Sequence, residues 1–262
     1  MSVDKLVDST QLDADLTSVA NAIRAKSGGS GSLAFPSGFV SEIGNISGGG
    51  DTLPSGYTAC NYIQSSGDAY IDTGVWEVPG ATSGFHGRFA ASNAGSNIKY
   101  LFGYQGIASG SVSKYRICLF VSTSNTLQYY GATSGASSTL GGWSNSGINE
   151  ITVSLTQNAT YPVFNINGTQ TTGNKLKTTE YSNAVGTIYL MANNYQASGP
   201  STVDTTVDGS WIRCYGFEIY MYGGAVRKFV PCVRDSDSVA GFYDYCSEAF
   251  YPSIGGNAFT YG

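Results

Sequence analysis

The sequence predicts a mainly β protein: an antiparallel two-sheet sandwich of the jelly-roll type, preceded by a short α-helical segment. From Tyr57 to the end, apolar and polar residues alternate with period two, and turn residues recur at short intervals. The chain holds 35 Gly and 19 Tyr but only 12% charged residues, which is typical of strands joined by tight turns. No helical pattern separates the roughly one dozen strand segments, so we expect antiparallel pairing.

The first part of the chain predicts two short helices. Residues 10–26 place apolar side chains on one helical face, carry acids near the start, and stop at a Ser-Gly-Gly sequence. Residues 36–46 predict a second helix with Pro36 at its first position. The apolar residues of these two stripes are our candidates for an anchor or oligomerisation surface: Leu12, Leu16, Val19, Ile23, Phe35, Phe39, Ile43 and Ile46.

Two helices of this length gain little by packing on each other alone, so we expect their apolar stripes to need a partner. One alternative is that they fold back onto the β domain. We favour self-association or docking on another chain, because the Gly-, Ser- and Pro-rich segment SGGGDTLPSG follows. The predicted organisation is therefore an anchor at 1–46, a linker at 47–56 and a β domain at 57–262.

The strand segments follow one another without a repeat of fixed period. The segment at 148–170 predicts a hairpin, because apolar and polar residues alternate on both arms and Asn167-Gly168 is a strong turn dipeptide. The segment WIRCYGFEIYMY predicts the longest strand, with Phe217, Ile219 and Met221 on one face. The remaining predicted strands lie in YTACNYIQ, AYIDTGVWEV, FHGRFAAS, YLFGYQGI, YRICLFVS, TLQYYGAT, GTIYLMANN, KFVPCVRDSDSVAGFYDY and AFYPSI.

Charge and hydropathy exclude some classes of partner. The formal net charge is −5, and the 13 Lys and Arg are scattered, so we expect no nucleic-acid binding. No apolar run approaches about 18 residues, which argues against membrane insertion. Acidic residues occupy the N-terminus where a secretion signal carries positive charge, so we expect synthesis and folding in a cytoplasm.

Two patterns resemble known families. The opening Tyr-Ile, Ser-x-Gly-x-x-Tyr-Ile-x-Thr-Gly and the closing Phe-x-Pro-Cys and Gly-x-Tyr-Asp resemble a concanavalin A-like lectin/glucanase (laminin-G-like) jelly roll found in phage and prophage proteins. The opening helix followed by Phe-Pro-x-x-Phe is similar to a short module of phage tail and fibre proteins. The residues that carry the first likeness are Tyr62, Ile63, Ser65 or Ser66, Gly67, Tyr70, Ile71, Thr73, Gly74, Phe229, Pro231, Cys232, Gly241, Tyr243, Asp244, Phe250, Phe259 and Gly262. Those that carry the second are Leu16, Ala20, Ala22, Ile23, Arg24, Lys26, Ser27, Gly28, Phe35, Pro36 and Phe39.

The resemblance implies a bacteriophage virion structural protein, a tail-fibre or head-fibre component located in the virion. Residues 1–46 would then contact other virion proteins or form a homotrimer, and the β domain would attach to a host surface polysaccharide. The alternative is a virion decoration, neck or tail component that binds nothing. From the residues themselves, we expect the matching positions to hold the first and last strands side by side, with the carboxylate of Asp244 tying a turn.

We expect no enzyme, and a glycan hydrolase is the third interpretation. The glucanase branch of this fold carries Glu-x-Asp-x-x-Glu or Glu-x-Asp-x-Glu on one strand, and the six Glu of this chain lack that spacing. The single histidine, His86, has no nucleophile-elbow sequence near it. We also expect no cofactor.

Glycan binding is the remaining class. Sugars are held by hydrogen bonds from polar side chains and by stacking on aromatic rings. Asp204 and Asp208 are candidates for calcium binding, although solvated turn residues are the alternative we favour. The residues that combine the polar and aromatic properties on apparent loops are Tyr104, Trp143, Asn145, Asn193, Asn194 and Tyr195.

Overall fold

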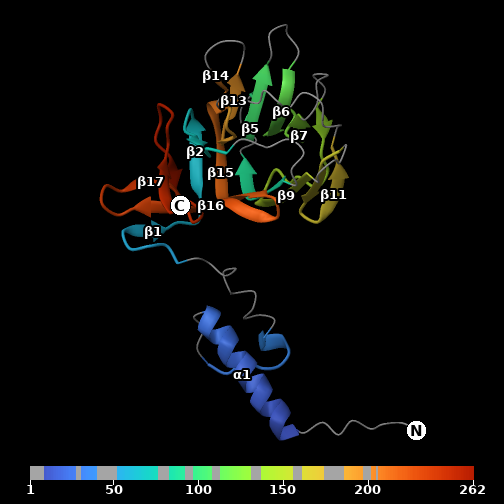
Figure 1. Ribbon diagram of the computed structural model, residues 1–262, viewed down its shortest axis with the longest axis vertical. Helices are drawn as coiled ribbons and strands as arrows, with labels where there is room; N and C mark the ends of the chain where they lie inside the picture. Colours follow the sequence, from blue (N-terminus) through green and yellow to red (C-terminus); the bar gives the residue numbers. More distant parts are fainter. Residues whose placement is uncertain are drawn as a thin grey trace, which may run out of the picture. The chain divides into compact units, whose positions relative to one another are not determined.

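A computed structural model describes the chain in two compact units, Met1–Thr52 and Leu53–Gly262, which we treat one at a time (Figure 1). The predicted limits of anchor, linker and β domain stay a prediction, because residues 40–51 lie outside the described residues. The residues that the structure describes are 9–27, 31–39, 52–75, 83–91, 97–107, 113–130, 137–155, 161–173, 186–196, 202–204 and 206–262.

The first unit contains one helix, α1 (Ser9–Ser27), and a segment at 31–39 whose last three described residues are helical. These two pieces form a small core of Ala20, Ile23 and Phe39, with Leu16 and Leu33 packed against it. The sequence led us to expect that both apolar stripes need an outside partner, and this is wrong for Ile23 and Phe39. Gly31 and the residues after it turn the chain back onto α1, and the Arg24 guanidinium donates to the carbonyl oxygen of Gly31 at 2.7 Å.

The rest of the stripe stays exposed in this unit. Leu12, Val19 and Phe35 keep 46%, 49% and 63% of their surface accessible. Ile43 and Ile46, and with them most of the predicted second helix, lie outside the described residues. No helix in the described part of the chain is long and apolar enough to span a membrane.

The second unit is built around a large sheet, sheet A. Its eleven strands in the described residues follow the order β11-β10-β9-β4-β15-β16-β17-β18, with β1 beside β16 and with β2 between β15 and β19. Their bounds are β11 (Thr169–Thr172), β10 (Val163–Ile166), β9 (Asn149–Leu155), β4 (Ser83–Ala91), β15 (Thr206–Met221), β16 (Gly224–Arg234), β17 (Val239–Asp244), β18 (Ala249–Pro252), β1 (Tyr57–Ala59), β2 (Ile63–Gly67) and β19 (Thr260–Tyr261).

A smaller sheet, sheet B, follows the order β14-β13-β5-β6-β7-β8, and β12 joins β3 to β5. The described strands pair antiparallel throughout both sheets, except that β13 runs parallel to β5. The predicted fold class, a mainly β two-sheet sandwich preceded by a short helix, is confirmed. The bounds in sheet B are β14 (Thr202–Asp204), β13 (Asn193–Gln196), β5 (Lys99–Ile107), β6 (Ser113–Val121), β7 (Leu127–Tyr130), β8 (Ser138–Thr139), β12 (Tyr189–Leu190) and β3 (Ile71–Asp72).

Aromatic side chains fill the space between the sheets. Phe85 and Phe217 of sheet A face Phe102 of sheet B, with ring centroids 4.9 and 5.1 Å apart. Tyr129 of sheet B meets Phe164 of sheet A in the same way at 4.8 Å. On β9 and β10 of sheet A the buried residues alternate with polar ones, so the period-two pattern of the sequence places every second side chain of these two strands in this core.

The predicted hairpin and turn are present. β9 pairs with β10 antiparallel, and Asn167-Gly168 turns the chain into β11 with both residues at positive φ, 51° and 83°. The predicted closeness of the first and last strands is also confirmed. β1 pairs with β16 from Tyr57 opposite Arg234, and β19 pairs with β2.

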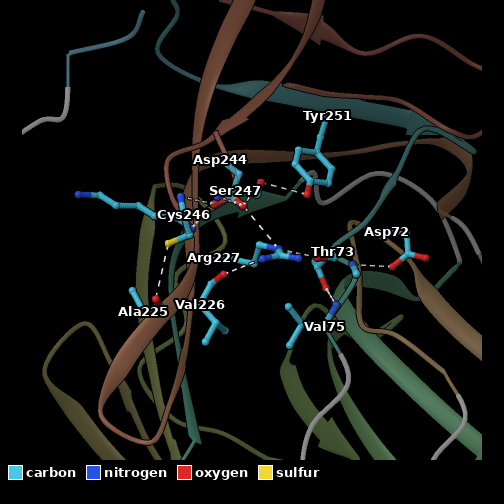
Figure 2. A network of polar contacts seen from close by, with 12 residues as sticks. Asp72, Thr73, Val75, Ala225, Val226, Arg227, Asp244, Cys246, Ser247 and Tyr251 are labelled. Carbon is cyan, nitrogen blue, oxygen red and sulfur yellow. Dashed lines mark hydrogen bonds and ion pairs between the residues drawn. The ribbon is translucent and has the colours of Figure 1, made fainter. Parts of the chain in front are cut away.

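A buried carboxylate ties the end of β17 to its surroundings (Figure 2). Asp244 accepts hydrogen bonds from the backbone amides of Lys228, Cys246 and Ser247 and from the Ser247 hydroxyl. Its Oδ2 lies 3.5 Å from Nε of Arg227, and that same Nε donates to the carbonyl oxygen of Thr73 at 2.8 Å. The carboxylate thus ties the turn, as predicted, and Arg227 extends this link to the segment after β3.

We expect Asp244→Ala to destabilise the second unit by about 3–5 kcal/mol, the usual cost of removing one member of a buried charged pair. The substitution leaves amide donors and the Arg227 guanidinium without their acceptor. Urea unfolding of the full chain measures it. The control is Asp237→Ala, the same chemical change at an exposed carboxylate that pairs with Arg234 at 2.7 Å, where we expect little change. Equal losses in the two variants would contradict the role given to Asp244.

Candidate functional site

The outer face of sheet A is the open face of the sandwich. Along β6 of sheet B, consecutive residues on both faces are buried, among them Cys118 at 0% and Phe120 at 1% exposure. Along β9 of sheet A, by contrast, Ile151 and Val153 are buried while the residues between and beside them are exposed. A binding site on a sheet surface is therefore available on sheet A.

Two hollows lie on this face where β9, β10 and β11 run side by side. Their volumes are about 300 and 280 Å³, and both are lined by Thr152 and Asn165, so they form one continuous depression. We call it the β9–β11 hollow. Its other lining residues are Glu150, Ser154, Val163, Asn167, Gly168 and Gln170.

The hollow presents polar groups that the protein leaves unpaired. The side chains of Thr152, Ser154 and Gln170 are exposed, and within the described residues none of them makes a hydrogen bond to another residue. Hydroxyl and amide groups of this kind donate and accept equally well. The hollow can therefore bind a ligand rich in hydroxyl groups.

One end of the hollow is held by a network of asparagines. The buried Asn149 donates to the carbonyl oxygens of Ser144 and Gly147 at 2.8 and 3.1 Å, and its Oδ1 accepts from the Ser144 amide and from Asn167 Nδ2. Asn167 also donates to the carbonyl oxygen of Gly142 and accepts from the backbone amide of Glu150. The loop at 141–148 is thereby fastened to the hollow.

Ionisable groups continue from the hollow across the same face. Nε2 of His86, on β4, lies 3.1 Å from Oε1 of Glu150, and its Nδ1 lies 3.6 Å from Oε2 of Glu218 on β15. The Tyr220 hydroxyl donates to Glu218. Burial, followed by this hydrogen bond, raises the pKa of Tyr220 to about 12, so the phenol stays protonated.

The structure places the ligand-binding residues that the sequence predicted on different elements of the β domain. Trp143 and Asn145 lie on the loop beside the hollow, where Trp143 is half-buried and Asn145 is exposed. The indole N–H of Trp143 donates to the side-chain Oδ1 of Asn145 at 2.8 Å. Tyr104 lies on β5 at 2% exposure. Asn193, Asn194 and Tyr195 lie on β13 rather than on a loop.

Tyr104, Asn193 and Asn194 do not lie on exposed loops as predicted, because each is buried on a strand of sheet B. Tyr104 packs its ring on the backbone of Gly186, where a Cβ would lie 2.2 Å from the ring. The side-chain Oδ1 of Asn193 accepts from the Cys118 thiol at 2.9 Å. The side-chain amide of Asn194 donates to the backbone carbonyl oxygen of Thr187 at 2.8 Å. All three side chains are buried inside sheet B, and within the described residues Oδ1 of Asn194 has no hydrogen-bond partner.

Sequence reasoning missed Thr152, Ser154, Asn165 and Gln170. A signal was present for Thr152, Ser154 and Asn165, because each occupies the solvent-facing position of a strand with period-two alternation, whereas Gln170 lies in the wholly polar strand β11. Nothing in the sequence, however, distinguishes an ordinary solvated strand face from a hollowed one.

The calcium candidates stay untested. Asp204 is the last residue of β14, where it pairs with Asn193, and Asp208 lies in β15. The side chains of both fall outside the described residues. Within the described part of the chain, no three His, Cys, Asp or Glu side chains gather as a metal site would require.

No protein-family model matches the chain, and no curated protein matches it. Solved structures do. A Trypanosoma rangeli sialidase in complex with sialic acid matches with 11% identity and a TM-score of 0.39, over 82% of this chain and 37% of that one. The CBM40 of the Ruminococcus gnavus IT-sialidase, bound to α2,3 sialyllactose, matches with 13% identity and a TM-score of 0.40, over 61% and 90%. The full extracellular region of zebrafish Gpr126/Adgrg6 matches with 13% identity and a TM-score of 0.42, over 77% and 26%.

These likenesses agree with a lectin-like sandwich. They give no information about a phage or virion role. This chain spans only 37% of the length of the sialidase it matches. At such TM-scores, the neighbours assign neither a ligand nor a reaction to it.

Sialidases are among the solved structures that the chain resembles, so we withdraw the expectation that it is no enzyme. It rested on a search for carboxylates at fixed spacing along one strand. The fold instead brings Glu150 of β9 and Glu218 of β15 to the two nitrogens of His86. Acids from separate strands meet on one face here, and a motif search along the sequence does not detect such a group.

We expect Asn149→Ala to release the loop at 141–148 and to destabilise the second unit by about 1–3 kcal/mol, because buried donors and acceptors lose their partner. Hydrogen exchange of the loop amides should accelerate while the strand amides of sheet B keep their protection. Asn145→Ala, on the same loop but exposed, is the control and should leave exchange elsewhere unchanged. Unaltered loop exchange in Asn149→Ala would show that other contacts hold the loop.

Proposed function

We propose that the chain is a bacteriophage fibre or adhesin that attaches to a host cell-surface glycan through the β9–β11 hollow. The observation that carries the binding part is the set of unpaired hydroxyl and amide groups in that hollow. A sugar offers hydroxyl groups in several directions, so it can pair with Thr152, Ser154 and Gln170 together. Each such hydrogen bond contributes about 0.5–1.5 kcal/mol net.

Aromatic residues near both ends of β10 support this assignment. Tyr161, which is 49% exposed, precedes the strand, and the loop with Trp143 is tied to Asn167 after it. Aromatic rings beside polar groups are the usual composition of a site that binds the apolar face of a sugar ring. The virion role rests on the resemblance of residues 16–39 and of the strands around Thr73 and Asp244 to phage proteins.

Binding is tested on the full chain with Thr152→Val and Gln170→Ala. We expect each to weaken binding to host cells, or to the glycan that an array identifies, by about three- to tenfold through the loss of one hydrogen bond. Thr260→Val is the matched control, because Thr260 is an exposed threonine on β19 of the same sheet and does not line the hollow. Affinity is measured by calorimetry, and any release of reducing sugar is followed in the same samples.

The outcomes separate the competing functions. Failure of the unsubstituted protein to bind host cells or any arrayed glycan would favour the alternative, a virion decoration, neck or tail component without a ligand. Equal losses in Thr152→Val and Thr260→Val would move the site away from the hollow. Sugar release that stops in Glu150→Gln or Glu218→Gln would favour the hydrolase.

We propose further that residues 1–46 join the chain to other virion proteins and assemble it as a homotrimer. The exposed apolar side chains Leu12, Val19 and Phe35 support this, because apolar groups on a helical unit this small gain by being covered. The proposed location is the virion, with the β domain displayed towards the host.

Light scattering of the full chain tests the assembly. We expect a trimer mass for the unsubstituted protein and a monomer for the double variant Val19→Asp and Phe35→Asp, since burying two new carboxylates is strongly unfavourable. The control is Ala14→Asp, an exposed position on the opposite side of α1 from the stripe. A monomeric unsubstituted protein would refute the homotrimer and leave the virion partners to be identified by pull-down from particles.

A further inference from the structure

One charged side chain lines the β9–β11 hollow. Among the described lining residues, all are neutral except Glu150, whose side chain is 65% exposed. Its backbone is fixed by the hydrogen bond to Asn167, and its carboxylate is oriented by His86 through Oε1. A carboxylate of fixed position therefore borders the groups proposed to hold the sugar.

No Lys or Arg neutralises this carboxylate within the described residues. Arg88 stands opposite Glu150 in the pairing of β4 with β9, but its guanidinium lies over the ring of Tyr215, 5.9 Å from the centroid. His86 is shared with a second carboxylate, that of Glu218. Lys228 lies opposite Glu218 on β16, three strands from β9 and hence about 14 Å away.

We propose that Glu150 sets the charge selectivity of the hollow, so that it prefers glycans with free amino groups, accepts neutral glycans less well, and rejects acidic ones. This inference rests on the proposed glycan binding. An ammonium group at hydrogen-bond distance from the carboxylate gains a charge-assisted bond. An acidic sugar in the same place is repelled by Glu150 and finds no cation among the lining residues.

The experiment measures the affinity of the full chain for three probes of similar length: a glucosamine hexamer with its amines protonated, an N-acetylglucosamine hexamer, and a hyaluronan hexasaccharide. We expect affinity to fall in that order. For Glu150→Gln, the ratio of affinities for the glucosamine hexamer and the N-acetylated hexamer should fall by about two- to fivefold, as for an exposed ion pair. The preference should also weaken as salt is added, because salt screens exposed charges.

Glu248→Gln is the control. It removes one carboxylate and changes the net charge equally, but Glu248 lies in the turn between β17 and β18 and does not line the hollow. Its affinity ratios should equal those of the unsubstituted protein. Tightest binding of hyaluronan, or an unchanged ratio in Glu150→Gln, overturns the charge selectivity while glycan binding stands. No binding of any probe, together with an array that shows no other ligand, overturns both.

Discussion

Asp244 has no exposed side-chain surface, yet it carries a charge at the end of a strand that must close the sandwich. Three backbone amides and one hydroxyl surround its carboxylate, and Arg227 connects it to the Thr73 carbonyl oxygen. The amides lie on β16 and on the turn after β17, whereas Thr73 follows β3 of sheet B. One carboxylate therefore fixes a turn, a strand pair and the approach of the second sheet. Its burial is tolerable only because every one of these donors is in place.

Gly74 shows how closely the sequence is adapted to this contact. The residue has a φ of 67°, its amide bonds to the Asp72 carboxylate, and a Cβ there would lie 3.3 Å from the Arg227 guanidinium. The link lies at the β16–β17 side of sheet A, where β1 and β19 also pair, while the β9–β11 hollow lies towards the other end of the strand order. The closure and the proposed binding site thus lie towards different edges of one sheet, so the residues that line the hollow can vary without disturbing the closure.

The sequence predicted the features that local chemistry decides. Alternation at Ile151 and Val153 marked a strand with one buried face, and Asn167-Gly168 marked a turn because both residues tolerate positive φ. It predicted strands where sheet B has β5, β6 and β7, but not that neighbouring residues on β6 are buried on both faces of that sheet. The sequence indicates an apparent loop at Asn193 and Asn194, whereas the fold buries both. The thiol of Cys118, from a distant strand, donates to Oδ1 of Asn193, and Asn194 donates to the nearby carbonyl oxygen of Thr187. The hollow was not predicted because its lining residues come from three paired strands, and no spacing within one strand encodes their combination.

The open hollow and the exposed stripe of α1 are best understood together. A shallow, solvated depression with a few unpaired hydroxyl and amide groups offers each sugar only a few bonds of about 0.5–1.5 kcal/mol. Against the cost of association, such a site gives a dissociation constant on the order of a millimolar. Joining several copies makes the second and third contacts intramolecular and raises the apparent affinity by about 10²–10⁴-fold without any new contact. The apparent affinity of a weak site on the β unit would therefore depend on the assembly that Leu12, Val19 and Phe35 are proposed to form. In the proposed assembly, the same weakness would let each single contact exchange rapidly while the assembly as a whole stays attached.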